Sequence, residues 1–437
     1  MHLIKSFAIE KLWGHAPTIH ADLDERFNFI IGRNGTGKTT VINLLAAVLT
    51  ADFERLDRID FEKVVVVFKE PGKRKNPSVE VNKVQREGSP YCDIRFLIRE
   101  SSKDAPIIYD LDALELERFY RGGPSRMTRE RMFKERFADI RDSLNYLIKV
   151  SWLSVHRHTD ENRYPEERKY IPAIDQKLRD LSNNLVRYFS TLSKKYADHT
   201  LEFQRKSFLS LLTPERSESV FSFAKSLDLD QEKETLGEIF QLLGVEPRHY
   251  NQKLKVHFEK LTKSIKTARE NGRSMLVDDF ATLYNAWRAH SLVADYEELQ
   301  SKKAEIFKPR DTFLEIINKL LEGRKRISLS ERNEITFTTE IKSNGGVTRR
   351  KDILVEELSS GEKQLLIILG EALLQQSAPS IYIADEPELS LHVLWQEQLT
   401  SAISQLNQNA QIVFATHSPD VVGVHGDKII DMEVILA

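Results

Sequence analysis

The feature that most constrains the fold is the run Gly32-Arg33-Asn34-Gly35-Thr36-Gly37-Lys38-Thr39, which fits the phosphate loop G-x-x-x-x-G-K-[ST]. A strand pattern, Arg26–Ile31, precedes it, and a helix pattern with one apolar face, Thr39–Leu49, follows it. The glycines let backbone amides curl around a polyphosphate, and the positive end of the helix dipole adds to the attraction. Strand, loop and helix in this order predict an α/β nucleotide-binding domain.

Two side chains of the loop are predicted to have separate chemical roles. Lys38 is expected to reach the β and γ phosphates, while Thr39 offers its hydroxyl to Mg²⁺. The predicted nucleotide-binding residues of this segment are Gly32, Arg33, Asn34, Gly35, Thr36, Gly37, Lys38, Thr39 and Thr40.

A pair of adjacent carboxylates lies near the other end of the chain. Ser380–Ala384 is a short apolar run that ends in Asp385-Glu386-Pro387, the Walker B arrangement of a buried strand with acidic residues at its carboxyl end. Asp385 is predicted to hold the metal ion through water, and Glu386 to polarise the attacking water as general base. The predicted metal-binding residues are therefore Thr39 and Asp385.

Two further segments complete a set of four motifs. Leu358-Ser359-Ser360-Gly361-Glu362-Lys363-Gln364 precedes a helix pattern, Leu365–Gln376, about 20 residues before the carboxylates. Thr416-His417-Ser418 follows Ile412–Ala415, another short buried strand pattern. Taken alone, a Ser-Gly pair is usually a helix N-cap and a lone histidine after a strand is usually structural.

Together, the four motifs resemble those of ABC-type ATPase heads. This group includes structural-maintenance-of-chromosomes proteins, RecF, the related double-strand-break repair ATPases and the overcoming-lysogenization-defect (OLD) nucleases. The resemblance implies an ABC-type P-loop NTPase fold with ATP and Mg²⁺ as ligands, and it implies that Glu386, Lys38 and His417 are catalytic, His417 being the switch histidine at the γ-phosphate. The signature residues implied to bind nucleotide are Ser359, Ser360, Gly361 and Glu362.

The residues that follow the carboxylates indicate which group of these ATPases the chain resembles most. Asp385 to His392 reads DEPELSLH, which looks like the DEPE-x-x-LH form of the OLD-like group, with Leu389–His392 as the D-loop. In this family the signature serine and glycine cap the ATP held by a partner subunit. One copy of each motif therefore implies a homodimer or higher homo-oligomer with nucleotide between subunits, whose geometry changes on hydrolysis.

Three functions remain open at this stage. The first is an ATP-hydrolysing switch of bacterial anti-phage defence, similar to the AriA group of PARIS ATPases or the PtuA group of Septu. Because 20 residues follow His417, too few for a nuclease domain, the effector nuclease of TOPRIM or HNH type is expected to be a separate chain, with a phage protein as trigger. The alternative is a RecF-like repair or chromosome-associated ATPase that clamps DNA. The third is a scaffold that assembles on ATP and barely hydrolyses it.

Some expected features have no clear place in the sequence. Gln85 and Gln176 are the candidates for the Q-loop glutamine, and no adenine-stacking residue can be assigned. Basic clusters that would serve DNA binding are Lys69, Lys73, Arg74 and Lys75, and Arg118, Arg121, Arg126, Arg129 and Arg131. Such clusters are more often solvated surface.

The rest of the chain predicts an insertion between two halves of one head. Residues 1–110 form the N-terminal half with a β-rich extension, 111–325 a mainly helical insertion with a short coiled coil, and 326–437 the C-terminal half. Within the insertion, Val150–Val155 resembles a strand. Two apolar stripes with helical spacing indicate a helix pair or small bundle: Leu178, Leu181, Leu185, Tyr188 and Leu192, and Leu254, Phe258, Leu261 and Ile265.

Composition excludes several classes. The chain has 437 residues with 64 Lys and Arg against 66 Asp and Glu, so it is not a basic nucleic-acid coat. No apolar run approaches the roughly 20 residues of a membrane helix, and the N-terminus lacks a secretory signal pattern. The single cysteine, Cys92, allows no internal disulfide. We therefore expect a cytoplasmic protein without membrane contact.

Overall fold

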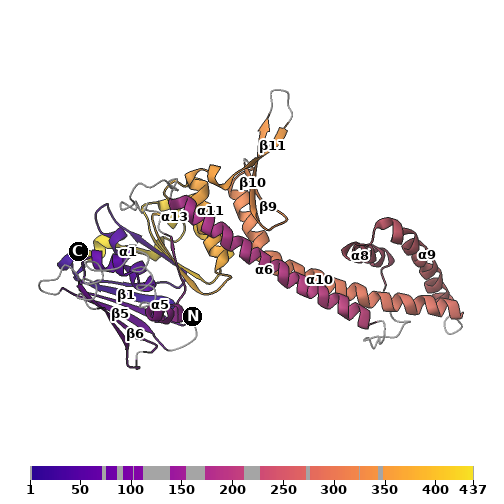
Figure 1. Ribbon diagram of the computed structural model, residues 1–437, viewed down its shortest axis with the longest axis horizontal. Coiled ribbons are helices and arrows are strands. Elements are labelled where there is room, and N and C mark those ends of the chain that lie inside the picture. The colour runs from indigo at the N-terminus through magenta and orange to yellow at the C-terminus, as the bar shows by residue number, and fades with distance from the viewer. Residues whose placement is uncertain are drawn as a thin grey trace, which may run out of the picture. The chain divides into compact units, whose positions relative to one another are not determined.

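The computed structural model describes residues 2–70, 75–85, 92–101, 103–111, 138–153, 173–210, 227–271, 276–323, 325–342 and 348–436. It divides into two compact units, Met1–Arg187 with Pro309–Ala437, and Tyr188–Lys308. All four sequence motifs lie in the first unit, which is built from both ends of the chain (Figure 1). No helix in the described ranges has both the length and the apolarity to cross a bilayer.

A parallel sheet of five strands forms the centre of the first unit. Its strands, in spatial order, are β14 (Ile429–Asp431), β3 (Phe27–Ile31), β13 (Ala410–Ala415), β12 (Ser380–Asp385) and β8 (Val150–Leu153). Every residue of β12 and β13 is buried, as expected for strands covered on both faces. The strand-like run in the predicted insertion is thus an edge strand of this sheet.

A second, antiparallel sheet contains the β-rich N-terminal segments. Its order is β2 (Ile19–Asp22), β1 (Leu3–Glu10), β4 (Lys63–Lys69), β5 (Ser78–Gln85), β6 (Cys92–Arg99) and β7 (Ile107–Leu111). The pattern of residues 3–31 predicts two strands, the second of them Arg26–Ile31, whereas the structure has three strands before the phosphate loop. The additional strand, β2, has only four residues and is too short to show a clear alternation.

One buried glutamine connects the two sheets. Gln411, on β13, is 0% exposed; its Oε1 accepts from the amide of Ile4 on β1, and its Nε2 donates to the carbonyls of Ile4 and Asp24, all within 2.8 Å. A buried amide must have all its polar atoms satisfied, so these bonds fix the first strand of the chain against one of the last.

Helices cover both sheets. α1 (Lys38–Thr50) packs on β8, β12 and β13, with Val41, Leu44, Leu45 and Val48 buried as the sequence predicts. Ile42, Ala46, Ala47 and Leu49 are buried too, because α2 and α5 also contact this helix. Other α-helices described in this unit are α2 (Phe53–Arg58), α5 (Ala138–Leu147), α11 (Ser360–Leu374), α12 (Val393–Leu406), α13 (Pro419–Val422) and α14 (Met432–Leu436), together with the start of α6 (Ala173–Leu209) and the end of α10 (Val277–Leu320). The P-loop α/β fold with a helical insertion is thereby confirmed.

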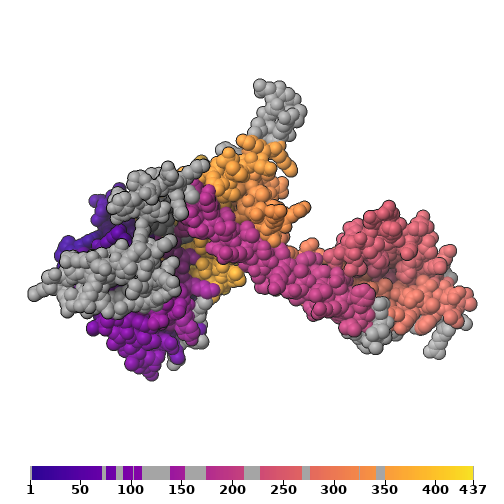
Figure 2. All heavy atoms as spheres, in the orientation of Figure 1, coloured from indigo at the N-terminus to yellow at the C-terminus, as the bar shows by residue number. Residues whose placement is uncertain are grey.

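A small third sheet precedes the signature segment. It contains β9 (Lys325–Leu329), β10 (Ile335–Lys342) and β11 (Thr348–Ile353), with β10 in the middle. In the space-filling view, the orange atoms of residues 325–374 lie directly against the magenta first turns of α6 (Ala173–Leu209) (Figure 2).

The second unit is helical. It contains α8 (Leu229–Leu242), α9 (Pro247–Asn271) and the parts of α6 and α10 (Val277–Leu320) that fall within residues 188–308. The predicted stripe of Leu254, Phe258, Leu261 and Ile265 is buried in one cluster with Leu283 and Trp287 of α10. These apolar side chains give the unit a core of its own.

Candidate functional site

The phosphate loop joins the carboxyl end of β3 to the amino end of α1. Lys38 is only 5% exposed, and its Nζ donates to the carbonyl oxygens of Gly32 and Arg33 at 2.8 and 3.0 Å. The first-turn amides of α1 have no intrahelical acceptor, so they face this loop with the positive end of the helix dipole. The loop is built to bind an anion.

Trp13 supports the loop from outside. Gly37 has φ +86°, and a Cβ at that position would stand 2.3 Å from the Trp13 ring. Both the backbone conformation and the close contact therefore require glycine. Trp13 itself is half-buried with φ +58°, and its amide donates to the carbonyl of Asp60 at 2.8 Å. Trp13 could not be predicted from the sequence, because nothing local links it to Gly37, 24 positions later.

The predicted catalytic side chains meet at one edge of the parallel sheet. β13 lies between β3 and β12, so the carboxyl ends of these three strands are neighbours. Thr39 Oγ1 donates to Asp385 Oδ1 at 3.2 Å, and Asp385 is 1% exposed. His417 Nε2 lies 3.7 Å from Glu386 Oε1. The structure thus brings Lys38, Thr39, Asp385, Glu386 and His417 to one place.

Glu386 has a strained backbone. Its φ is +47°, in the left-handed region that residues with a Cβ rarely adopt, and its amide donates to the Ala415 carbonyl at 2.8 Å. Such outliers gather at functional sites, where the surrounding structure enforces them. The carboxylate of this residue is the one that lies 3.7 Å from His417 Nε2.

The electrostatics of the site are those of a cation among carboxylates. Burial lowers the pKa of Lys38, while Glu386, Asp385 and Glu433 act in the opposite direction by their negative charge. The ammonium can neutralise part of the charge of a triphosphate, whereas the three carboxylates would repel it unless a bound cation offsets them.

The donor set fits a hydrated Mg²⁺. This ion prefers oxygen ligands and usually takes only one or two from the protein, with water and phosphate completing an octahedron. The hydroxyl of Thr39 and the carboxylate of Asp385 are hard oxygen donors already within hydrogen-bond distance of each other. These two residues would hold the ion.

The signature segment begins α11 with a capping box. Ser359 is the N-cap; its Oγ accepts from the amide of Glu362 at 3.3 Å, and the Glu362 carboxylate accepts from the Ser359 amide at 2.7 Å. Ser359 and Ser360 are exposed, and Gly361 is buried. The serines therefore lie on the surface with a fixed backbone.

The signature helix packs directly on the D-loop. A Cβ on Gly361 would stand 2.2 Å from the carbonyl oxygen of Ser390, so only glycine fits there. Gln364 Nε2 donates to the carbonyl of Pro387 at 2.8 Å. Beside this contact the D-loop and α12 expose three apolar side chains, Leu389, Val393 and Leu394.

The last helix of the described chain touches the phosphate loop. Glu433 Oε1 accepts from the amide of Arg33 at 3.0 Å and lies 3.4 Å from its Nε. Sequence analysis missed this contact, because α14 has only five residues and follows a three-residue strand, which leaves no periodic signal.

Other sequence candidates are not part of this cluster. Gln176 is exposed and donates to Asp180 on its own helix at 3.3 Å, and the side chain of Gln85 is outside the described residues. Lys69 pairs with Glu25 at 3.2 Å. Lys73, Arg74 and the arginines from Arg118 to Arg131 also lie outside the described ranges.

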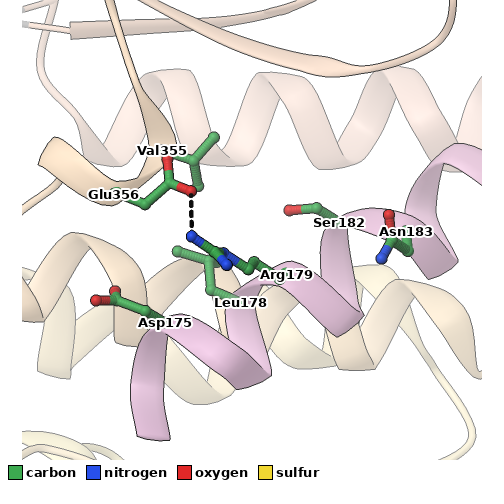
Figure 3. A pocket seen from close by; sticks show the side chains of 7 residues that line it. All are labelled: Asp175, Leu178, Arg179, Ser182, Asn183, Val355 and Glu356. Carbon is green, nitrogen blue, oxygen red and sulfur yellow. Dashed lines mark hydrogen bonds and ion pairs between the residues drawn. The ribbon is translucent and has the colours of Figure 1, made fainter. Parts of the chain in front are cut away.

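Ionic contacts connect the first turns of α6 to the signature segment. Lys363 pairs with Asp175 at 2.7 Å, with side chains only 11% and 15% exposed. Arg179 pairs with Glu356 at 3.3 Å across a groove of about 290 Å³ (Figure 3). Burial lowers the pKa of Lys177 and raises that of Glu371, and each opposes the shift of the other by its charge. A Cβ on Gly370 would stand 2.8 Å from Leu181.

The similarity of the chain to known proteins is shown at the level of a family. The family model described as "AAA ATPase domain" matches residues 4–422. Curated proteins provide no match. Among solved structures, the Smc head domain of Pyrococcus furiosus bound to the C-terminal domain of ScpA is 16% identical, with a TM-score of 0.43 over 99% of this chain and 93% of that one. The Smc head domain of Pyrococcus yayanosii is 14% identical, with a TM-score of 0.39 over 99% and 95%.

Proposed function

Because the chain belongs to the AAA ATPase domain family, we propose that it binds ATP with Mg²⁺ at the phosphate loop and hydrolyses the γ-phosphate. The observation that carries this is the convergence of Thr39, Asp385, Glu386 and His417 at the carboxyl edge of β12 and β13. Mg²⁺ bound by Thr39 and Asp385 supplies neutralisation of phosphate charge.

Each residue then has a defined task in hydrolysis. Lys38 leaves its two carbonyl partners and binds phosphate oxygens, aided by the loop amides. Glu386 accepts a proton from the attacking water, and its enforced backbone conformation holds the carboxylate in place. His417, beside Glu386, is positioned to donate a hydrogen bond to the γ-phosphate.

A homodimer is the assembly we propose. Ser359 and Ser360 are exposed on a backbone that is fixed by the capping box, next to the exposed apolar side chains of Leu389, Val393 and Leu394. Exposed apolar groups that gather beside polar ligand-binding positions are typical of a contact surface. The signature serines of one subunit would cap the nucleotide in the loop of the other.

We further propose that nucleotide state controls the helical insertion and, through it, a separate effector nuclease in anti-phage defence. The contacts between α11 and the start of α6 support control of the insertion by nucleotide. Because Lys363 of α11 is paired with Asp175 of α6, movement of the signature helix must also move Asp175. The DEPE-x-x-LH wording supports the defence assignment. A DNA-clamping ATPase is the second candidate.

The direct test compares the wild type with Glu386→Gln. The variant is expected to bind ATP and form ATP-dependent dimers, measured by light scattering, but to hydrolyse about 100-fold more slowly or less. Glu397→Gln, an exposed glutamate of α12, serves as the matched control and should behave as wild type. Equal hydrolysis rates for wild type and Glu386→Gln would refute the proposed general base.

The two biological candidates separate in a second experiment. A switch should co-purify with a nuclease whose activity changes when ATP is hydrolysed. A clamp should instead bind bare duplex DNA with strong salt dependence, because phosphate contacts release counterions.

A further inference from the structure

Glu388 is a buried carboxylate that has no role in the proposed steps of hydrolysis. It is 9% exposed and lies two residues after Glu386 in the D-E-P-E run. Its Oε1 accepts three hydrogen bonds, from Thr416 Oγ1 at 2.6 Å, the His417 amide at 2.8 Å and the Ser418 amide at 3.2 Å. All three donors belong to the segment that carries the switch histidine.

The second oxygen of this carboxylate makes the arrangement costly. Glu388 Oε2 is buried and has no hydrogen-bond partner among the residues that the structure describes. A buried acceptor without a partner reduces stability, and an apolar residue would avoid that cost. The three bonds to the first oxygen are the compensating contribution, and they all act on the position of one loop.

Hydrogen bonds to α12 also connect the switch segment to the D-loop. Ser418 Oγ donates to Gln396 Oε1 at 2.7 Å, and Gln396 Nε2 donates to the carbonyl of Leu391 in the D-loop at 3.0 Å. D-loop, switch segment and α12 are therefore joined by hydrogen bonds on both sides. Displacement of the D-loop has to move the backbone of His417.

The signature helix contacts the same D-loop. Gln364 bonds to the carbonyl of Pro387, the residue before Glu388, and Gly361 lies against the carbonyl of Ser390, two residues after it. Glu388 lies in the chain between these two contacts with the signature helix and bonds directly to the backbone amide of His417.

We propose that Glu388 is a positioning residue that holds His417 against Glu386 and transmits the position of the signature and D-loop segment to it. This inference rests on the proposed ATPase function and deepens it. In a dimer, nucleotide capped by the signature of one chain would then adjust the histidine of that same chain. A structural role alone would predict only lower stability when Glu388 is replaced.

The test measures kcat, KM for ATP and nucleotide affinity for Glu388→Ala, Glu388→Gln and His417→Ala. Glu388→Ala should lower kcat about 10- to 100-fold, the effect of charge-assisted hydrogen bonds lost, with KM and nucleotide affinity within about 3-fold of wild type. Glu388→Gln keeps an acceptor oxygen and should recover most of kcat. The double variant Glu388→Ala/His417→Ala should be no slower than His417→Ala alone.

A matched control is Asp24→Ala. Asp24 also caps backbone amides, those of Arg26 at 2.8 Å and Phe27 at 3.4 Å, but in the turn between β2 and β3. It should lose stability without loss of kcat. If Glu388→Ala fails to bind nucleotide because it does not fold, Thr416→Val is tested instead, since it removes one of the three donors with little change in volume. Thr416→Val should lower kcat by a smaller factor, and it should lower kcat no further when His417 is already alanine.

The proposed ATPase function and the proposed role of Glu388 would fail in different ways. Wild-type hydrolysis that is insensitive to Glu386→Gln would refute the proposed function itself. Hydrolysis that requires Glu386 but is unchanged in Glu388→Ala, or is lowered additively with His417→Ala, would overturn only the role of Glu388.

Discussion

The hydroxyl of Thr39 donates a 3.2 Å hydrogen bond to the carboxylate of Asp385, although 346 positions separate the two residues in the chain. The contact exists because β3 and β12 lie on either side of β13 and end at the same edge. It places the two residues predicted to hold Mg²⁺ within hydrogen-bond distance of each other. A preorganised pair of this kind should dominate metal affinity.

Asp385→Asn should therefore raise the Mg²⁺ concentration needed for half-maximal hydrolysis about 10- to 100-fold. Nucleotide binding in the presence of a chelator should change little, because Lys38 and the loop amides remain. Mg²⁺ titrations of hydrolysis and of nucleotide fluorescence measure the two effects. Asp352→Asn, an exposed residue of β11, is the control, and an unchanged Mg²⁺ requirement in Asp385→Asn would contradict the assigned ligand.

Ser359→Arg should prevent ATP-dependent dimerisation while nucleotide binding to the monomer is retained. Ser359 is exposed at the start of α11, so a bulky cation there obstructs a partner without disturbing its own loop. Loss of the N-cap is expected to cost about 1 kcal/mol of the free energy of unfolding. Light scattering in the Glu386→Gln background measures dimerisation, and Ser377→Arg, after the other end of α11, is the control. A dimer that persists in Ser359→Arg would count against the proposed interface.

The sequence predicts those parts of the fold that depend on local patterns. The loop from Gly32 to Thr39 has glycine at each of its three positive-φ positions, and β12 and β13 are mostly apolar because both faces are covered. The five site residues that converge at this edge were all identified from such segments. Their contacts follow from the strand order, which the structure shows.

The missed features depend on packing between distant segments. Trp13 contacts Gly37 through a turn with no periodic pattern, and Glu433 reaches Arg33 from a five-residue helix. Glu388 was visible in the D-E-P-E run, but its role depends on three donors 28 to 30 positions away. Long-range hydrogen bonds of this kind leave no signature in residue spacing.

Stability should fall at acidic pH through Glu362. Burial by itself would raise the pKa of this carboxyl, but hydrogen bonds from Lys325 and Ser359 outweigh it and leave the pKa below its ordinary value of 4.5. A lowered pKa in the folded state gives stability that is present above pH 4.5 and is lost as pH falls through the folded value. Glu362→Gln should therefore reduce the free energy of unfolding by about 1 kcal/mol at pH 7, and the difference should shrink below pH 4.5 in denaturant titrations. A difference that is constant with pH would contradict the assignment.

The buried charges Lys177 and Glu371 should be replaceable only together. Burial lowers the pKa of Lys177 and raises that of Glu371, which means that both ionised groups are held at a cost. Glu371→Gln removes a carboxylate whose charge offsets the desolvation of the half-buried Lys177, and it should reduce the free energy of unfolding by about 1 kcal/mol. Lys177→Met with Glu371→Leu should be as stable as wild type or more so. Denaturant unfolding of both variants checks this, and a double variant less stable than either single one would contradict it.

The ion pair of Lys363 with Asp175 gives the sharpest test of coupling between nucleotide and insertion. Because it joins the signature helix to the first turn of α6 and is largely shielded from solvent, Asp175→Asn should weaken the transmission of ATP binding to α6 without changing nucleotide affinity. In wild type, ATP should increase the hydrogen-exchange protection of residues 173–187. In the variant this increase should be reduced by at least half, while protection of the phosphate loop by ATP remains. Asp180→Asn, which loses only a bond to Gln176 on the same helix, is the matched control. Equal protection of α6 in Asp175→Asn and wild type would show that the ion pair does not carry the signal, and that Gly370 against Leu181 is the contact to test instead.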